Sequence, residues 1–248
     1  MQSKSASASP FAGHHSALRG LTLASALAGA TILAAGPVQA APMLYEAILA
    51  PLSNSGVSGL ARLSQDGTML TVNIMASGLT PNQTHVQHIH GRLDDAGNPI
   101  KSVTPTLAQD TDGDGFIELA EGVPSYGPVI LNFNTPSGQF PTAPNGVVNF
   151  TQTYDLSNSP SFAQGFTMED LLPLTLREIV LHGALLDSQT GLGFGPNEAN
   201  GIAGYKAALP VAAGEIRAVP VPEPASLALF SAGLLGLGLV RRRRARRA

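Results

Sequence analysis

Short alternating segments separated by turn-forming residues fill the middle of this chain, and they limit the folds it can adopt. Residues 59–64 alternate apolar and polar side chains, and residues 69–76 continue the alternation after Asp66-Gly67. An Asp-Gly pair between two such runs is typical of a β-hairpin. The sequence therefore predicts antiparallel pairing of these two segments.

The same pattern recurs along the chain. Six further segments have the apolar or β-branched character of strands, namely 45–50, 86–90, 128–133, 147–154, 177–182 and 214–218. One short helix is predicted at 167–172, because Thr167 is a favoured capping residue and acidic residues follow it in the first turn. Short strands interrupted by glycine and proline predict an all-β fold, an antiparallel β-sandwich with short helices in its loops.

The N-terminal 40 residues differ from this middle region. They have a basic start, an apolar stretch at 21–35 and, at the end, Val38-Gln39-Ala40, which is a small-x-Ala cleavage pattern. The combination predicts that residues 1–40 are a signal peptide for export. A buried N-terminal helix is the alternative, but Gly36-Pro37 would interrupt it.

The C-terminal segment, 219–248, is also distinct. It contains Val221-Pro222-Glu223-Pro224, sixteen uncharged residues at 225–240 and an arginine cluster at 241–247. The apolar run is shorter than the roughly 20 residues that cross a bilayer comfortably, but with arginines to hold its end in the cytoplasm it predicts a transmembrane segment. A nucleic-acid-binding tail would explain the arginines and not the apolar run.

Pro-Glu-Pro, the apolar run and the arginine cluster together resemble the PEP-CTERM sorting signal of Gram-negative bacteria. The resemblance implies recognition by exosortase-type sorting machinery and transient anchoring in the inner membrane. It also implies removal of the tail and delivery to the cell surface or to an extracellular exopolysaccharide matrix.

Residues 41–218 remain as one domain's worth of chain. They hold sixteen acidic against six basic residues, a net charge of −10. So acidic a domain is expected to repel nucleic acid and anionic membranes and to attract cations. The chain has no cysteine, so its stability must come from the core or from bound ions.

This domain has four histidines, and three of them lie within six residues. His85, His88 and His90 fall in or beside one predicted strand, and His182 ends another. Residues two apart on a strand share a face, so His88 and His90 are expected to point one way and His85 the other. His88, His90 and His182 would together supply three nitrogen ligands to Cu²⁺ or Zn²⁺ and leave one coordination position open. The alternative is that all three are core residues hydrogen-bonded to each other and to the backbone.

Residues 110–121 fit the twelve-residue EF-hand calcium loop at every position. The expected ligands are the side chains of Asp110, Asp112 and Asp114, the carbonyl of Phe116, Glu118 through water, and a bidentate Glu121. Prolines in the flanking segments 103–105 and 122–124 predict that no helix stands on either side. The pattern therefore predicts a freestanding structural Ca²⁺ site and not a sensor. An acidic, solvated loop is the alternative.

Several segments of the domain resemble the CHRD domain, namely 59–62, 70–72, 77–79, 88–91 and 213–216. The CHRD domain is similar in fold to Cu/Zn superoxide dismutase, so the resemblance implies a Greek-key sandwich. His85-x-x-His88-x-His90 has the spacing of the first histidine cluster of the dismutase, in which the last two bind copper and the first is structural. His182 matches a further copper ligand, and residues 203–206 lie where the dismutase carries an anion-guiding arginine.

The departures from the dismutase bear on function. Residues 91–127 contain no histidine, whereas the dismutase places its bridging histidine and zinc ligands in this loop. This favours a non-catalytic, surface-exported protein for structure, adhesion or matrix association, in which Lys206 is only a surface charge. A copper-binding superoxide dismutase-like enzyme is the alternative. No Ser-His-Asp set, glycine-rich phosphate loop or pair of catalytic carboxylates supports a hydrolase or a nucleotide-binding protein.

Overall fold

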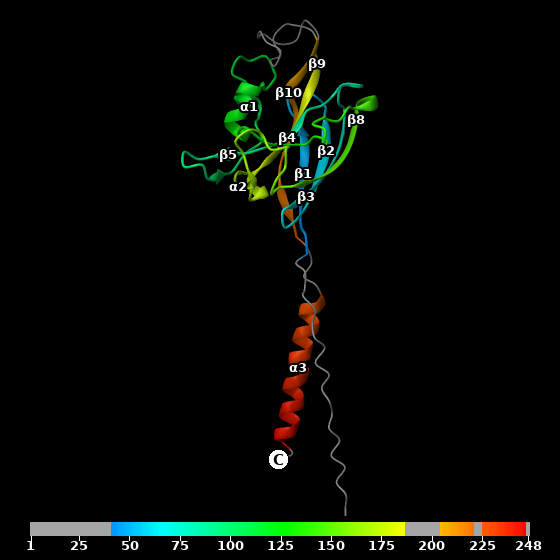
Figure 1. Ribbon diagram of the computed structural model, residues 1–248, viewed down its shortest axis with the longest axis vertical. Helices are drawn as coiled ribbons and strands as arrows, with labels where there is room; N and C mark the ends of the chain where they lie inside the picture. Colours follow the sequence, from blue (N-terminus) through cyan, green and yellow to red (C-terminus); the bar gives the residue numbers. More distant parts are fainter. Residues whose placement is uncertain (1–40, 187–203, 221–224, 247–248) are drawn as a thin grey trace, which may run out of the picture. The chain divides into compact units, whose positions relative to one another are not determined.

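The computed structural model describes residues 41–186, 204–220 and 225–246, and the expected signal peptide lies outside these ranges. The long strands are β1 (Met43–Pro51), β2 (Ser58–Asp66), β3 (Met69–Ser77), β8 (Val147–Asp155), β9 (Glu178–Leu186) and β10 (Gly204–Glu215). The short ones are β4 (Gln87–His90), β5 (Arg92–Leu93), β6 (Pro99–Ile100), β7 (Val129–Asn132) and β11 (Arg217–Val219). The helices are α1 (Leu119–Tyr126), α2 (Met168–Leu171) and α3 (Ala225–Ala245), with 3₁₀ turns η1 (Leu107–Gln109), η2 (Pro144–Gly146) and η3 (Leu174–Leu176). The all-β prediction with short helices in loops is confirmed (Figure 1).

The main sheet is antiparallel and folds into two layers. Its strand order is β7-β4-β9-β10-β1-β2-β3-β8, and β11 adds to β1. Strand β1 pairs with β2 over residues 43–49, while Ala50 and Pro51 pair with Ala213 and Ala212 of β10. The end of β1 therefore joins the layer β1-β2-β3-β8 to the layer β7-β4-β9-β10, as in a β-sandwich.

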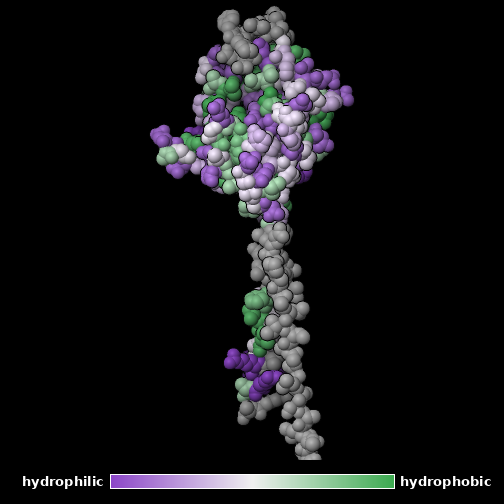
Figure 2. Space-filling view, in the orientation of Figure 1, coloured by the Kyte–Doolittle hydropathy of each residue, from purple (hydrophilic) through white to green (hydrophobic). Residues whose placement is uncertain are grey.

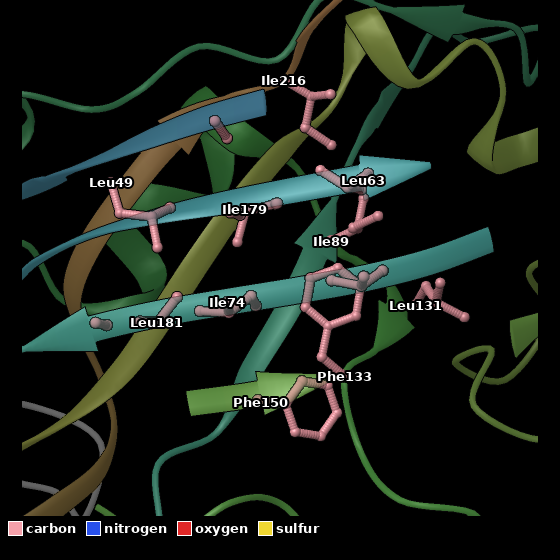
Figure 3. Close-up of a cluster of buried hydrophobic side chains, with 14 of the residues drawn as sticks. Leu49, Leu63, Ile74, Ile89, Leu131, Phe133, Phe150, Ile179, Leu181 and Ile216 are labelled. Carbon is pink, nitrogen blue, oxygen red and sulfur yellow. The ribbon is translucent and has the colours of Figure 1, made fainter. Parts of the chain in front are cut away.

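The main hydrophobic core lies between these layers. Its large members come from both sides, Leu63, Ile74 and Phe150 from one layer and Ile89, Leu131, Ile179 and Leu181 from the other (Figure 3). Burying one such side chain contributes roughly 1.5–3 kcal/mol. Because successive residues of a strand face opposite sides, the neighbours of Ile89, Ile179 and Leu181 point away from this core.

Strands occur at all eight predicted segments, and α2 begins after Thr167 with the expected capping. The sequence does not predict residues 204–213 of β10. This part of β10 contains Pro210, and the pairing with β9 shifts register on either side of that residue. A bulge tolerates a residue that lacks an N–H, so the strand continues where the sequence pattern suggests a break.

Helix α1 contradicts the prediction that no helix follows the acidic loop. It begins after Glu118 and runs through Gly122 and Pro124. Glu118 and Glu121 form a capping box, in which each side chain accepts a hydrogen bond from the other residue's backbone N–H. In so short a helix Pro124 removes only one backbone hydrogen bond, and the capping offsets that loss.

Helix α3 takes in the arginines at 241–244 after the apolar run. Figure 2 shows the change from hydrophobic to hydrophilic along it. Within the described ranges, no helix has an apolar span of the length needed to cross a membrane. The transmembrane segment that the sequence predicts is thus not found among the described residues.

Arg177 connects the loops beside the sheet. Its side chain is fully buried, and its guanidinium donates only to backbone carbonyls. The Nε atom lies 2.9 Å from the Leu171 oxygen, and Nη1 lies 3.2 and 3.3 Å from the oxygens of Arg92 and Ile100. Nη2 donates to Asp170. An added Cβ at Gly91 would lie 2.7 Å from Arg177 Cδ, so only glycine leaves room for this arrangement.

We predict that Arg177→Met lowers the free energy of unfolding by about 3 kcal/mol or more, because it leaves several buried carbonyls without donors. Arg177→Lys should recover only a small part of this loss, since an ammonium cannot reach all four carbonyls. Urea unfolding measures the effect, with Arg62→Met on the exposed face of β2 as the control. A loss below about 1 kcal/mol for Arg177→Met would contradict this role.

Candidate functional site

The pairing of β4 with β9 brings three histidines onto one face of the sheet. His88 pairs with Val180 in this register, and His182 lies two residues further along β9. Ile89 enters the main core, so His88 and His90 face the opposite side, as does His182 next to the core residue Leu181. The three histidines are 9%, 0% and 2% exposed in sequence order. The structure therefore brings together the three residues that the sequence singles out.

Nitrogen atoms of the three rings converge. The ring centroids of His88 and His182 are 5.1 Å apart, those of His88 and His90 are 5.5 Å apart, and those of His90 and His182 are 5.7 Å apart. One nitrogen from each ring lies within 4.8 Å of the other two. His88 Nδ1, His90 Nε2 and His182 Nε2 are buried and have no hydrogen-bond partner among the described residues.

The second nitrogen of two rings is held by the backbone. His90 Nδ1 lies 2.8 Å from the Gly127 oxygen, and His182 Nδ1 lies 2.7 Å from the Ala208 oxygen. A carbonyl only accepts, so Nδ1 carries the hydrogen in both rings and Nε2 presents a lone pair. Backbone carbonyls that orient a histidine in this way are typical of metal-ligating histidines.

Burial keeps these imidazoles neutral. It lowers the pKa of His90 to about 3 and that of His182 to about 4. Burial also lowers the pKa of His88 well below its usual value, and its two histidine neighbours add to the effect. Neutral imidazole is the form that binds metals. Protons are therefore expected to compete for these nitrogens at a lower pH than the usual histidine pKa of about 6.5 suggests.

Two aromatic rings and a small hydrophobic cluster lie against the histidines. The Tyr126 ring centroid is 4.5 Å from that of His90, and the Phe140 centroid is 5.5 Å from that of His88. Tyr126 belongs to a second buried cluster, which also contains Leu52, Ile117, Val180 and Ala213. Helix α1 and the end of the acidic loop thus pack on the face of the sheet that carries the histidines.

Sequence reasoning missed two polar groups at this site. Glu178 pairs with His90 across β4 and β9 and is fully buried. Thr104 donates to its Oε1, while Glu178 Oε2 and the Tyr126 hydroxyl have no hydrogen-bond partner among the described residues. Burial raises the pKa of Glu178 to about 7. The signal in the sequence was the spacing of Glu178 from His182, which puts both on one face of a strand.

His85 lies apart from the trio, as the sequence predicts. It precedes β4 and is 1% exposed, and its ring nitrogens contact the carbonyls of His182 (2.9 Å) and Thr80 (3.0 Å). The expectation that Lys206 is a surface charge is wrong. Lys206 is 4% exposed because β10 begins at Gly204 and pairs Lys206 with Ala184 inside the sheet. Ala203, the first residue of that motif, lies outside the described residues.

The acidic loop is folded around its own carboxylates. Asp110 accepts hydrogen bonds from the backbone N–H groups of Gly113 (2.7 Å) and Gly115 (2.9 Å). Asp114 Oδ1 accepts from Phe116, while its Oδ2 is buried and has no partner among the described residues. Gly115 has a φ of 89°, so it takes the left-handed turn expected at this position.

The carboxylates of this loop gather in two overlapping groups, Asp110, Asp112 and Glu121, and Asp112, Asp114 and Glu118. In each group, one oxygen per residue lies within 4.8 Å of the others. Desolvation and the neighbouring carboxylates raise the pKa of Asp112. Repulsion between like charges of this kind is relieved by a bound cation. All five predicted side-chain ligands are therefore close together, and Phe116, the carbonyl ligand, lies between them in the chain.

Comparison with known families finds the PEP-CTERM protein-sorting motif at residues 220–244. A search of curated proteins finds no match to this chain. The match confirms the PEP-CTERM sorting signal that the sequence predicts and supports an exported protein handled by exosortase-type machinery. The motif lies outside the β domain, so the likeness of residues 41–218 to the CHRD domain and to the dismutase remains a prediction.

The lowered histidine pKa values predict a pH-dependent stability of the metal-free protein. Below about pH 6.5 the unfolded chain binds protons that the folded chain refuses, so stability falls as the pH drops toward 4. The raised pKa of Glu178 acts in the opposite direction between 4.5 and about 7, so the histidine contribution must be isolated by a variant.

In His182→Gln, the free energy of unfolding should fall less steeply between pH 6.5 and 4.5 than in the wild type. The two slopes should differ by roughly 1 kcal/mol per pH unit. Urea unfolding of wild type and variant at each pH measures the difference. Parallel curves for the two proteins would show that His182 is protonated as easily in the folded chain as in the unfolded one.

Proposed function

We propose that this chain is an exported, surface-associated β-sandwich that binds a transition-metal ion through His88, His90 and His182 and a structural Ca²⁺ through residues 110–121. Two observations together carry the first site: one nitrogen from each of the three buried rings lies within 4.8 Å of the other two, and each ring has a buried nitrogen without a hydrogen-bond partner among the described residues. Buried polar groups normally find a partner, so three orphans on one small site indicate a missing ligand. We infer a binding or structural role, with the CHRD-type sandwich as its scaffold.

The donor set suits copper or zinc. Three neutral imidazole nitrogens match the ligand preference of Zn²⁺ and Cu²⁺, and Cu²⁺ binds nitrogen sites more tightly than Zn²⁺. His90 and His182 would ligate through Nε2, because their Nδ1 atoms are held by backbone carbonyls, and His88 would ligate through Nδ1. A bound ion of this kind supplies a Lewis-acid centre and, for copper, a redox centre.

A copper enzyme of the dismutase type is the second candidate, and the placement of three histidines on β4 and β9 favours it. Two features argue against it. Residues 91–127 supply no bridging histidine for proton delivery. Lys206, in the position of the anion-guiding arginine, is buried instead of facing solvent.

The calcium site is supported by the loop geometry. The five acidic side chains of the EF-hand pattern form two overlapping groups, and one oxygen of Asp114 is buried without a partner. Ca²⁺ prefers carboxylate and carbonyl oxygens in this arrangement. Helix α1 follows the loop, but only the three-residue turn η1 precedes it. A single site without a helix pair suits structural stabilisation better than signalling.

The sorting motif supports export of the proposed binding protein. We infer that exosortase-type machinery removes the C-terminal tail after transient anchoring and releases the domain at the cell surface. A domain with a net charge of −10 is not expected to bind nucleic acid. An exopolysaccharide matrix is the proposed surrounding.

We predict that the purified domain binds one Cu²⁺ per chain, with nitrogen hyperfine splitting in its electron paramagnetic resonance spectrum. His90→Asn and His182→Asn should each lose this spectrum. His85→Asn should keep it while lowering the melting temperature, because the ring nitrogens of His85 contact the backbone carbonyls of His182 and Thr80 and are not among the proposed ligands. An unchanged spectrum in His182→Asn would refute the three-histidine site.

The same copper-loaded protein separates the two candidate functions. Superoxide decay should remain near the rate of free buffer if the site only binds metal. Fast decay that His182→Asn abolishes would establish the dismutase-like enzyme in its place.

We also predict that Ca²⁺ raises the melting temperature of the wild type. If the affinity is that of extracellular calcium modules, with a Kd of about 10⁻⁴–10⁻³ M, then 10 mM Ca²⁺ stabilises by roughly 1–3 kcal/mol. Glu121→Gln should remove this gain, since glutamine keeps the capping box and loses the bidentate carboxylate. Asp95→Asn, an exposed carboxylate elsewhere, is the matched control. A wild-type melting temperature that is the same in calcium and in chelator would leave only an acidic loop.

A further inference from the structure

We propose that calcium in the loop 110–121 regulates the three-histidine site, and that helix α1 transmits the effect by positioning His90. The inference rests on the proposed function, because it assumes that both sites bind their ions. The helix begins with residues of the acidic loop and ends with residues that contact a histidine of the trio. Helix α1 thus links the acidic loop to His90 directly, without a further helix or strand between them.

The start of α1 is part of the calcium loop. Glu121 is the last residue of the loop and the third residue of the helix. Its Oε1 accepts hydrogen bonds from the N–H (2.5 Å) and the hydroxyl (2.7 Å) of Thr111, near the beginning of the loop. Its Oε2 accepts from the N–H of Glu118, the N-cap of the helix, at 3.0 Å. Whatever orders the Glu121 carboxylate therefore also orders the first turn of α1.

The end of α1 is attached to His90. Tyr126, the last helical residue, packs edge-on against His90, with a centroid distance of 4.5 Å. The carbonyl of Gly127, the C-cap, accepts the hydrogen bond from His90 Nδ1 at 2.8 Å. This bond selects the tautomer that leaves Nε2 free to ligate. A shift of the helix end would change both the tilt and the tautomer preference of the His90 ring.

The helix itself is a tight connection. Tyr126 lies over Gly122 one turn earlier, where an added Cβ would be 2.3 Å from the tyrosine hydroxyl. Ile117 of the loop packs in the same small cluster as Tyr126 and Val180, and its N–H donates to Ser53 Oγ at 2.8 Å. Because Val180 pairs with His88, this cluster gives the loop a second contact with the histidine site.

The expected sign of the coupling is positive. Without calcium, the loop carboxylates repel one another and the first turn of α1 can sample other arrangements. A metal that fixes His90 must then also order this turn, which lowers its affinity by the entropy lost. Calcium bound in the loop orders the turn beforehand, so the metal at the histidines no longer bears that entropy loss. Repulsion between the two cations opposes the effect weakly, because the helix spans about 12 Å and the Debye length is about 8 Å at physiological salt.

The test uses the whole domain, as secreted and freed of metal, with Co²⁺ as the probe. Visible absorption bands of Co²⁺ report a nitrogen-rich site, and titrations are run with no calcium and with 10 mM Ca²⁺. Calcium should lower the Kd for Co²⁺ by about fivefold or more, within the usual range of coupling between sites. By reciprocity, saturating Co²⁺ should lower the Kd for Ca²⁺ by the same factor, which a purely structural role of α1 would not produce.

Two variants separate calcium binding by the loop from transmission through Tyr126. Glu121→Gln should keep Co²⁺ binding and lose its dependence on calcium. Gly122→Ala leaves every proposed ligand in place but displaces the Tyr126 ring, so it should bind both ions with the mutual effect reduced and the Co²⁺ bands shifted. Asp95→Asn should behave as the wild type.

The outcomes are distinguishable. Co²⁺ bound by the histidines with the same Kd in both calcium conditions would overturn the coupling and leave the proposed function standing. No nitrogen-type Co²⁺ bands in any condition would overturn the proposed site and the coupling with it. A full mutual effect in Gly122→Ala would exclude transmission through Tyr126.

Discussion

The pairing of β4 with β9 is the constraint on which the rest of this structure depends. Strand geometry sends Ile89 into the main core, and it therefore sends His88 and His90 to the opposite face. The register of that pairing sets His182 beside them. A shift of one residue would move the histidines into the core and the apolar residues out, so the hydrophobic core itself holds the histidine face in place.

The end of the acidic loop and helix α1 pack on the face of the sheet that carries the histidines. Ile117 and Tyr126 belong to the small hydrophobic cluster on this face. Burial of the histidines lowers their pKa values. Burial of three neutral imidazoles, each with one nitrogen unpaired among the described residues, costs free energy in the metal-free protein. A metal bound there, as we propose, would offset that cost.

Buried polar groups of two kinds therefore serve different ends in this domain. Arg177 donates hydrogen bonds to four backbone carbonyls and holds the loops together. His90 and His182 are satisfied at one nitrogen and open at the other. The contrast is between a buried charge that is paired with backbone carbonyls and two buried rings that each keep one nitrogen unpaired among the described residues.

The sequence by itself determined eight strand segments, the C-terminal sorting signal and the chemical character of both candidate sites, because alternation, turn residues and ligand spacing are local properties. It failed at α1, where Pro124 suggested a break and the capping box prevailed, and at Lys206, which β10 carries into the sheet ahead of the bulge at Pro210. Only the tertiary structure could bring Tyr126 and Glu178 to the histidines. Contacts between segments distant in sequence follow from packing and register, which no local pattern encodes.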